Sequence, residues 1–199
     1  MTELYLVRHG QTDWNRLGRV QGRTDIPLNE TGRAEAAHIA EIIAGLDRVD
    51  IIASSPLSRA AETAGIIAAR RPSVPLLTRA GLIKRDHGSL EGLSPAERRS
   101  LHASGRAIER LESREDVVRR VRAELSALAA THAGGRAVIV SHGGVIRSLL
   151  QVTLGVDEST REAFIANGSA HRFRWLDGVL TLIEFNAAAT AEHPDSIRG

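Results

Sequence analysis

Three short, mostly apolar runs, at 4–7, 49–53 and 137–140, place the strongest constraint on the fold of this chain. Each run is too short for an ordinary helix and has no continuous polar face, which is typical of a strand buried inside a parallel sheet. Amphipathic helical patterns separate the runs, and in the clearest, from 34 to 46, apolar residues recur every three or four positions. This alternation predicts a three-layer α/β/α sandwich with a mostly parallel central sheet.

Two other regions of the chain have a distinct character. Residues 169–175 and 179–185 have strand-like composition and flank Asp177-Gly178, a dipeptide that favours a tight turn between antiparallel strands. Residues 84–112 are charged and interrupted by glycine and serine, and we expect them to form a short excursion on the substrate side. Residues 187–199 are expected to form a loose tail.

The length suits one domain, 1–199, and the composition excludes several classes of protein. The chain has 26 basic and 24 acidic residues, a balance that disfavours a dedicated nucleic-acid-binding protein. It has no cysteine, and its histidines lack metal-ligand spacing, so no metal is expected. No signal peptide and no run of about 18 apolar residues is evident. We therefore expect a cytoplasmic protein without a membrane partner, and the sequence indicates no particular oligomeric state.

Polar residues follow three of the predicted strands. The three turns are Arg8-His9-Gly10, Ser54-Ser55-Pro56 and Ser141-His142-Gly143. Open α/β sheets bind ligands at the carboxyl ends of their strands, so these turns are expected to meet at one edge of the sheet. The helix after the second turn carries Arg59. His9, Arg59 and His142 are therefore predicted to converge, although they are far apart in the sequence.

Two imidazoles and two guanidinium groups around one cleft suit a tetrahedral phosphate dianion. Arg8 and Arg59 would bond its oxygens in pairs and stay charged at any working pH. A helix that begins at Gly143 would direct backbone N–H groups at the same anion. The surrounding cations would keep His9 neutral, which leaves a ring nitrogen free to attack phosphorus. Gly10 is expected to let the backbone approach the anion closely.

Four motifs in order resemble the histidine phosphatase superfamily, in its phosphoglycerate-mutase-like branch. The motifs are LVRHGQTDWN, GRTDIPLNETGRAEA, SSPLSRAAETA and VIVSHGGVIRSLL, and the match runs from residue 4 to about 150. Any one of them is a weak signal, but four in this order and spacing are highly specific. The resemblance implies a three-layer α/β fold and phosphoryl-transfer chemistry that needs neither a metal nor another cofactor.

The resemblance also implies roles for individual residues. It implies a covalent phosphohistidine intermediate on His9. The other members of the phosphate pocket that it implies are Arg8, Arg59 and His142. The residues that it implies near the substrate are Asn15, as a hydrogen-bond donor, Gln21 and Gly22.

One position departs from the family pattern. The pattern usually has a proton-donating Glu two residues after a Leu, followed by Gly and then Glu-Gly. Here the segment reads LIKRDHGSLEG, and Lys84 occupies the Glu position. A carboxylic acid in a cleft can protonate a leaving alkoxide, whereas lysine, with an ordinary pKa of about 10.4, is a poorer acid. Three alternatives stay open: Asp86 donates the proton, Lys84 binds an anionic substrate or stabilises the leaving group, or the chain only binds a phospholigand.

The segment between Glu91 and Ser141 is short. Mutases that resemble this chain usually carry longer insertions that enclose a bisphosphorylated intermediate, whereas a compact chain resembles the phosphatases, in which water reaches the phosphohistidine. We therefore predict a phosphoric monoester hydrolase that acts on a small phosphorylated metabolite, and a phosphoglycerate-type mutase is the alternative. Substrate specificity is expected to lie in 84–112 and near Asn167.

Overall fold

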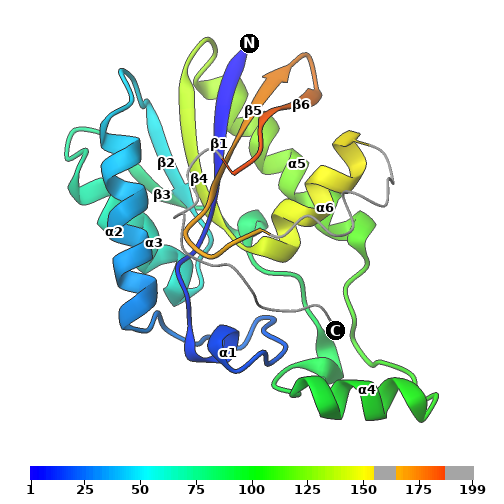
Figure 1. The fold of residues 1–199 in the computed structure, drawn as a ribbon. Helices are drawn as coiled ribbons and strands as arrows, with labels where there is room; N and C mark the ends of the chain where they lie inside the picture. Colours follow the sequence, from blue (N-terminus) through cyan, green and yellow to red (C-terminus); the bar gives the residue numbers. More distant parts are fainter. Residues whose placement is uncertain (155–164, 187–199) are drawn as a thin grey trace.

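The computed structural model describes residues 1–154 and 165–186, so the expected tail at 187–199 lies outside the described residues. A six-stranded sheet with strand order β3-β2-β4-β1-β5-β6 forms the centre of the molecule (Figure 1). β1 to β4 pair in parallel, and β5 and β6 pair antiparallel at one edge. The strands are β1 (Thr2–Arg8), β2 (Ile51–Ser54), β3 (Leu76–Thr78), β4 (Arg136–Ser141), β5 (Ala170–Leu176) and β6 (Val179–Glu184).

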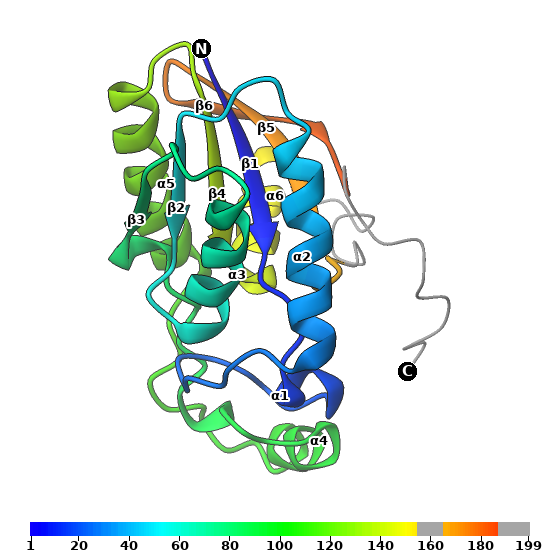
Figure 2. The same ribbon diagram turned by 90° about the vertical axis from the view of Figure 1, so that its left-hand side faces the viewer.

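Helices cover both faces of the sheet, which confirms the predicted three-layer sandwich. In Figures 1 and 2, α2 and α3 lie on one face, and α5 and α6 lie on the other. α2 begins where the Asn29 side chain accepts a hydrogen bond from the Gly32 N–H, and α5 begins where Ser113 accepts one from Asp116. A capping side chain therefore fixes where each of these two helices begins. These helices span α2 (Glu30–Ala44), α3 (Ser58–Ala69), α5 (Arg114–Thr131) and α6 (Gly143–Leu154).

Alternating side chains of the central strands divide the core into two halves. Leu4 and Leu6 of β1 belong to the half that includes α5 and α6, whereas Tyr5 and Val7 belong to the half under α2 and α3. All four are buried, which is why the strand has no polar face. Burying one large apolar side chain stabilises a fold by about 1.5–3 kcal/mol, so burial on both faces fixes the register of β1 and the position of the residues after it.

The carboxyl-terminal hairpin is confirmed. β5 and β6 are joined by Asp177 and Gly178, whose φ angles of 48° and 81° are both positive. Such backbone suits the tight turns that match the twist of two antiparallel strands, and glycine and aspartate adopt it at low cost. At the opposite edge of the sheet lies the short strand β3, which pairs in parallel with β2.

The excursion at 84–112 leaves the layers of the sandwich. It follows the short helix η1 (Ala80–Leu82) and contains η2 (Gly88–Leu90) and α4 (Pro95–Ala103). Figures 1 and 2 place α4 near α1 (Asp13–Arg16), beyond the carboxyl ends of the strands. The excursion therefore borders the edge of the sheet where α/β proteins bind ligands. Among residues 1–154 and 165–186, no helix is both long enough and apolar enough to cross a membrane.

Candidate active site

The carboxyl ends of β1 and β4 bring His9 and His142 side by side. The two strands pair in parallel, and their last pair is Arg8 opposite Ser141. His9 directly follows Arg8, and His142 directly follows Ser141. The His9 N–H donates to the Ser141 carbonyl at 3.1 Å, which fixes the backbone where β1 ends. The two imidazole rings meet edge to face, with centroids 5.1 Å apart. The sheet register therefore assembles this pair.

One short contact fixes the orientation of the His9 ring. Its Nδ1 lies 2.7 Å from the Gly10 carbonyl oxygen. A carbonyl can only accept, so Nδ1 carries the ring proton and Nε2 keeps its lone pair. Burial lowers the pKa of His9 well below 6.5, and the positive charges of Arg8, Arg59 and Lys84 lower it further. The ring is therefore neutral at pH 7, as a nucleophile at phosphorus requires.

Arg59 lies in the first turn of α3 and is completely buried. Its guanidinium group donates to the carbonyl oxygens of Gly22, at 2.8 Å, and Thr24, at 3.1 Å. Burial lowers the pKa of Arg59 to about 10, and the negative charges of Asp25 and Glu91 partly oppose this effect. Arg59 is therefore still charged at pH 7, and the two carbonyls hold its planar group in one orientation.

Arg8 is the last residue of β1 and lines a cleft at the end of the strand. Its Nη1 donates to the Ile165 carbonyl, and burial is the main cause that lowers its pKa to about 10. Gly143, the first residue of α6, packs directly on this side chain. A Cβ at Gly143 would lie 3.2 Å from both Cδ and Nε of Arg8. The glycine at the start of the helix thus leaves room for the guanidinium group.

His142 is held by a serine that sequence reasoning did not single out. Its Nε2 lies 2.8 Å from the Ser55 hydroxyl, which also accepts a hydrogen bond from the Leu57 N–H. The Ser55 proton is then available for Nε2, which leaves His142 Nδ1 as an N–H donor. Burial lowers the pKa of His142 well below 6.5, with a further contribution from His9. Ser55 belongs to the polar turn after β2, and that position was the signal that could have identified it.

Four buried nitrogen atoms of predicted site residues have no hydrogen-bond partner among the described residues. Buried polar groups of this kind are ordinarily paired, so a cluster of them indicates a place for acceptor atoms. Three belong to positively charged or ring N–H groups, which suit the oxygen atoms of a phosphate. The four atoms are Nε of Arg8, Nε2 of Gln21, Nε of Arg59 and Nδ1 of His142.

Asn15 and Gln21 line the cleft and bind each other. The Asn15 amide nitrogen donates to Oε1 of Gln21 at 3.3 Å, and the Thr12 hydroxyl donates to the same oxygen. Asn167 supports the pair from the other side, because its Nδ2 contacts Oδ1 of Asn15 and the His9 carbonyl, both at 3.1 Å. Asn167 was expected only to lie near the specificity region, and the structure gives it a positioning contact to the nucleophile's backbone.

The cleft has a volume of about 270 Å³, which suits a small molecule or part of one. Its described lining contains no aspartate or glutamate. The same described part of the chain has no cluster of histidine and acidic side chains able to hold a metal ion. The lining is instead strongly basic and therefore favours an anion. Its cationic side chains are Arg8, Arg19, Lys84, Arg98 and Arg147.

The structure places Lys84 and Asp86 differently with respect to the cleft. Lys84 lines the cleft, whereas Asp86, which we expected as an alternative proton donor, is not among the lining residues. Oδ1 of Asp86 accepts the Gly88 N–H at 2.8 Å, and Oδ2 lies 3.8 Å from the Arg23 guanidinium group. These contacts hold the carboxylate against its own loop. Asp86 as the proton donor therefore stays a prediction, and these contacts count against it.

Two of the predicted glycines pack against neighbouring segments. A Cβ on Gly10 would lie 2.1 Å from the Gly32 carbonyl, so Gly10 permits close packing on the start of α2. Gly22 does not line the cleft. Its carbonyl binds Arg59, and a Cβ there would collide with Oε1 of Glu91 at 1.7 Å. Gly22 therefore contributes to the site through Arg59.

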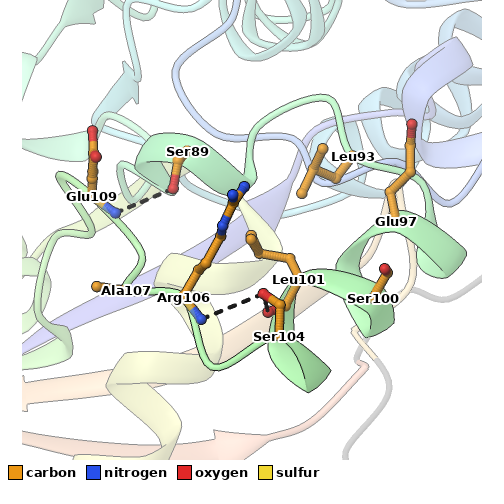
Figure 3. Close-up of a pocket in the computed structure, with 9 residues that line it drawn as sticks. All are labelled: Ser89, Leu93, Glu97, Ser100, Leu101, Ser104, Arg106, Ala107 and Glu109. Atoms are coloured by element: carbon orange, nitrogen blue, oxygen red, sulfur yellow. Dashed lines mark hydrogen bonds between the residues drawn. The ribbon is translucent and has the colours of Figure 1, made fainter.

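A larger hollow, of about 540 Å³, lies within the excursion (Figure 3). Figure 3 shows Leu93, Leu101 and Arg106 on its walls, with the Ser104 hydroxyl bonded to the Arg106 N–H. It shares no lining residue with the cleft beside His9. Cavity size alone is therefore a poor guide here, because the residues predicted to form the phosphate site line the smaller cavity and not the larger one.

Together, these contacts define a class of site: a small basic cleft in which an unprotonated imidazole nitrogen faces donors for phosphate oxygens. The model of the histidine phosphatase superfamily (branch 1) matches residues 4–188. The chain belongs to this superfamily, which confirms the family suggested by its four motifs. The predicted enzyme class, a phosphoric monoester hydrolase, is confirmed at this level.

Individual relatives include both phosphatases and mutases. The chain is 32% identical over 186 residues to the uncharacterized phosphatase PhoE of Bacillus subtilis, covering 94% of this chain and 95% of that protein. It is 36% identical to a 2,3-bisphosphoglycerate-dependent phosphoglycerate mutase of Gloeobacter violaceus, covering 75% of this chain and 74% of that protein. A phosphoserine phosphatase from Entamoeba histolytica, solved with 3-phosphoglyceric acid, has 30% identity and a TM-score of 0.78, covering 94% of this chain and 98% of that one.

Proposed function

We propose that this protein hydrolyses a phosphomonoester of a small metabolite through a covalent phosphohistidine on His9. The observation that carries the proposal is the orientation of His9, whose Nδ1 is bound to the Gly10 carbonyl at 2.7 Å. Nε2 is thereby left with its lone pair in a basic cleft. The phosphorylated compounds that solved relatives bind or act on support a small phosphorylated substrate.

In the first step, Nε2 of His9 attacks phosphorus and the bond to the leaving oxygen breaks. Arg8, Arg59 and His142 donate to the equatorial oxygens, where charge accumulates in the transition state. Asn15 and Gln21 complete the ring of donors. In the second step, water attacks the phosphohistidine, the N–P bond breaks, and His9 returns to its neutral form with inorganic phosphate released.

A mutase would return the phosphoryl group to a substrate instead of to water. That alternative requires the intermediate to stay enclosed long enough to transfer its phosphate. Here, the excursion contains only two short helical segments. One of its residues that line the cleft, Arg98, is exposed to solvent. An open border of this kind favours access of water, so hydrolysis is the reaction that we propose.

Rapid-quench labelling tests the proposal. With a phosphoester radiolabelled in its phosphate, the wild-type protein should acquire acid-labile protein-bound phosphate and release free phosphate. His9→Ala should abolish the label, whereas His38→Ala, at an exposed position on α2, should not. Formation of an isomerised product without free phosphate would select the mutase. Absence of label across a broad phosphoester panel would instead identify a phospholigand-binding protein.

A further inference from the structure

We propose that Lys84 is the proton donor to the leaving group, in the place where the family pattern has a carboxylic acid. The inference rests on the proposed hydrolase function, and it goes beyond the role expected for Lys84 from the sequence, which was to bind an anionic substrate or stabilise the leaving group. Its basis is the position of the ammonium group in the cleft, together with the absence of a competing acid from the described lining.

Lys84 enters the cleft from the segment between η1 and η2, opposite the start of α6. Its Nζ packs on Gly144, where a Cβ would lie only 2.8 Å from that nitrogen. The charge of Lys84 also contributes to lowering the pKa of both His9 and His142. The ammonium group therefore reaches the same region as the nucleophile, from a different wall of the cleft.

The other titratable groups nearby cannot replace it. The Asp86 carboxylate binds its own loop, and the Glu91 carboxylate accepts backbone hydrogen bonds from Arg23 and Thr24 at 2.8 and 2.9 Å. His87 lines the cleft, but burial lowers its pKa to about 4, so its ring carries no extra proton at pH 7. Lys84 is then the remaining proton source beside the reacting groups.

The surroundings of Lys84 also convert an ordinarily weak acid into an effective one. Burial lowers its pKa to about 7, and repulsion from four arginines contributes. A donor whose pKa lies near the working pH combines a large protonated fraction with easy proton release. A bound phosphate dianion would favour the ammonium form further, so the group is charged when the substrate is present. The four arginines are Arg8 of β1, Arg59 of α3, Arg147 of α6 and the adjacent Arg85.

Composition gives an independent indication. Lys84 is the single lysine among the 26 basic residues of the chain, and all the others are arginines. An arginine cannot release its proton in the working range of an enzyme, whereas a desolvated lysine can. The chain thus has its one side-chain ammonium group at the position where the reaction requires an acid.

The proton balance follows directly. As Nε2 of His9 bonds to phosphorus, the P–O bond breaks and its electron pair stays on the leaving oxygen, which takes a proton from Nζ of Lys84. The product leaves as an alcohol and Lys84 is a neutral amine. That amine then removes a proton from the attacking water as the N–P bond breaks, which restores the ammonium group and the neutral imidazole.

The leaving group provides the first test. Nitrophenolate leaves without protonation, whereas an alkoxide does not, so Lys84→Arg should lower kcat for an alkyl phosphate by about 100-fold or more and for nitrophenyl phosphate by less than about tenfold. Lys84→Met should show the same selectivity with a higher KM. Arg98→Met, a cleft-lining control, should affect both esters equally. Equal losses on both esters in Lys84→Arg would overturn the role.

The single lysine allows a second, direct test. Protein labelled with nitrogen-15 at lysine Nζ has one side-chain signal, whose pH titration reports the ionisation of Lys84. A midpoint below about 9 supports the proposal, and a midpoint at the ordinary value for lysine overturns it. Labelling of His9 by radiolabelled nitrophenyl phosphate separates the two proposals. If Lys84→Arg still acquires the label but loses the same factor in kcat on both esters, only the role of Lys84 is refuted. If the wild-type protein acquires no label, the hydrolase function is refuted.

Discussion

The cleft has two walls of different construction. The strand-end wall carries Arg8, His9 and Gly143, which lie where paired parallel strands end or directly after them. The excursion wall carries Lys84 and His87, which lie on a segment outside the sheet. His9 is almost completely buried, with 3% of its surface exposed, whereas Lys84 and His87 are half-buried.

This difference assigns separate tasks to the two walls. Backbone hydrogen bonds and core packing hold the strand-end wall, so it can present a nucleophile and phosphate donors with little freedom. Loop segments tolerate changes that a buried strand does not. In the proposed mechanism, the groups that bind phosphate therefore belong to the sheet, and the group that protonates the leaving oxygen belongs to the excursion.

The largest effect in this comparison is expected at Arg59 on the strand-end side. Arg59→Lys keeps a charge but loses the fork that binds the Gly22 and Thr24 carbonyls. Loss of a preorganised donor typically lowers kcat by about 10²–10³-fold. Steady-state kinetics on nitrophenyl phosphate would measure it. Arg70→Lys, at the exposed end of the same helix, is the matched control and should retain full activity. If Arg59→Lys kept the wild-type kcat, a positive charge at this position would be enough for activity and the planar guanidinium group would not be required.

Ser55→Ala should have the next largest effect. The substitution removes the hydroxyl 2.8 Å from Nε2 of His142, so the ring is no longer held with Nδ1 as the donor. We expect kcat to fall by about 10–100-fold, because an oriented hydrogen-bond partner of this kind selects the tautomer. Ser100→Ala, on the exposed side of α4, should leave kcat unchanged. If Ser55→Ala had the wild-type kcat, Ser55 would have no role in orienting His142 for the reaction.

Buried histidines should make the fold sensitive to acid. Burial lowers the pKa of His171 to about 4, whereas the unfolded chain protonates near 6.5. Below pH 6.5 the unfolded state binds more protons, so the free energy of unfolding should decrease as the pH falls, by about 1.4 kcal/mol per unit for each such histidine. Urea unfolding between pH 7 and 5 would measure the slope.

The slope has its own control pair. His171→Asn should flatten it by the contribution of one histidine, and His102→Asn, at an exposed position on α4, should leave it unchanged. If both variants kept the wild-type slope, the acid sensitivity would have to come from other groups.

The smallest effect is expected at Gly144. In Gly144→Ala, the new Cβ displaces Nζ of Lys84 without removing it, since the neighbouring atom is the end of a flexible side chain. Turnover of an alkyl phosphate should fall by about two- to tenfold, with little change for nitrophenyl phosphate, because misplacing a donor reduces only the step that needs it. If the ratio of kcat on the two esters stayed at its wild-type value, the position of Nζ of Lys84 would not affect protonation of the leaving group.

Much of the strand-end wall could be predicted from the chain itself. The apolar run before Arg8 predicts a buried strand, and the polar residues after it must then lie at the carboxyl edge of the sheet. The same reasoning placed His142 and, through the helix after β2, Arg59. It did not single out Ser55, and it expected Asn167 only near the specificity region, because a serine in a turn and an asparagine in a loop have many ordinary roles.

The excursion wall could not be predicted in the same way. Lys84 and Asp86 are two residues apart on a segment without a regular hydrophobic period, so nothing in the spacing determines which side chain enters the cleft. In the structure, Gly88 and Arg23 hold the Asp86 carboxylate, and the space beside Gly144 accommodates Lys84. Such contacts depend on residues distant in the chain, which local patterns do not encode.

The order of apolar strands, amphipathic helices and polar turns by itself determined the α/β sandwich and the edge of the sheet where the polar turns meet, because burial on two faces leaves a strand few alternatives. The four motifs determined the family. Only the tertiary structure decided the tautomer of His9, the partner of His142 and which side chain of the excursion enters the cleft. Those outcomes depend on hydrogen bonds, burial and charges that exist only once segments from the whole chain have come together.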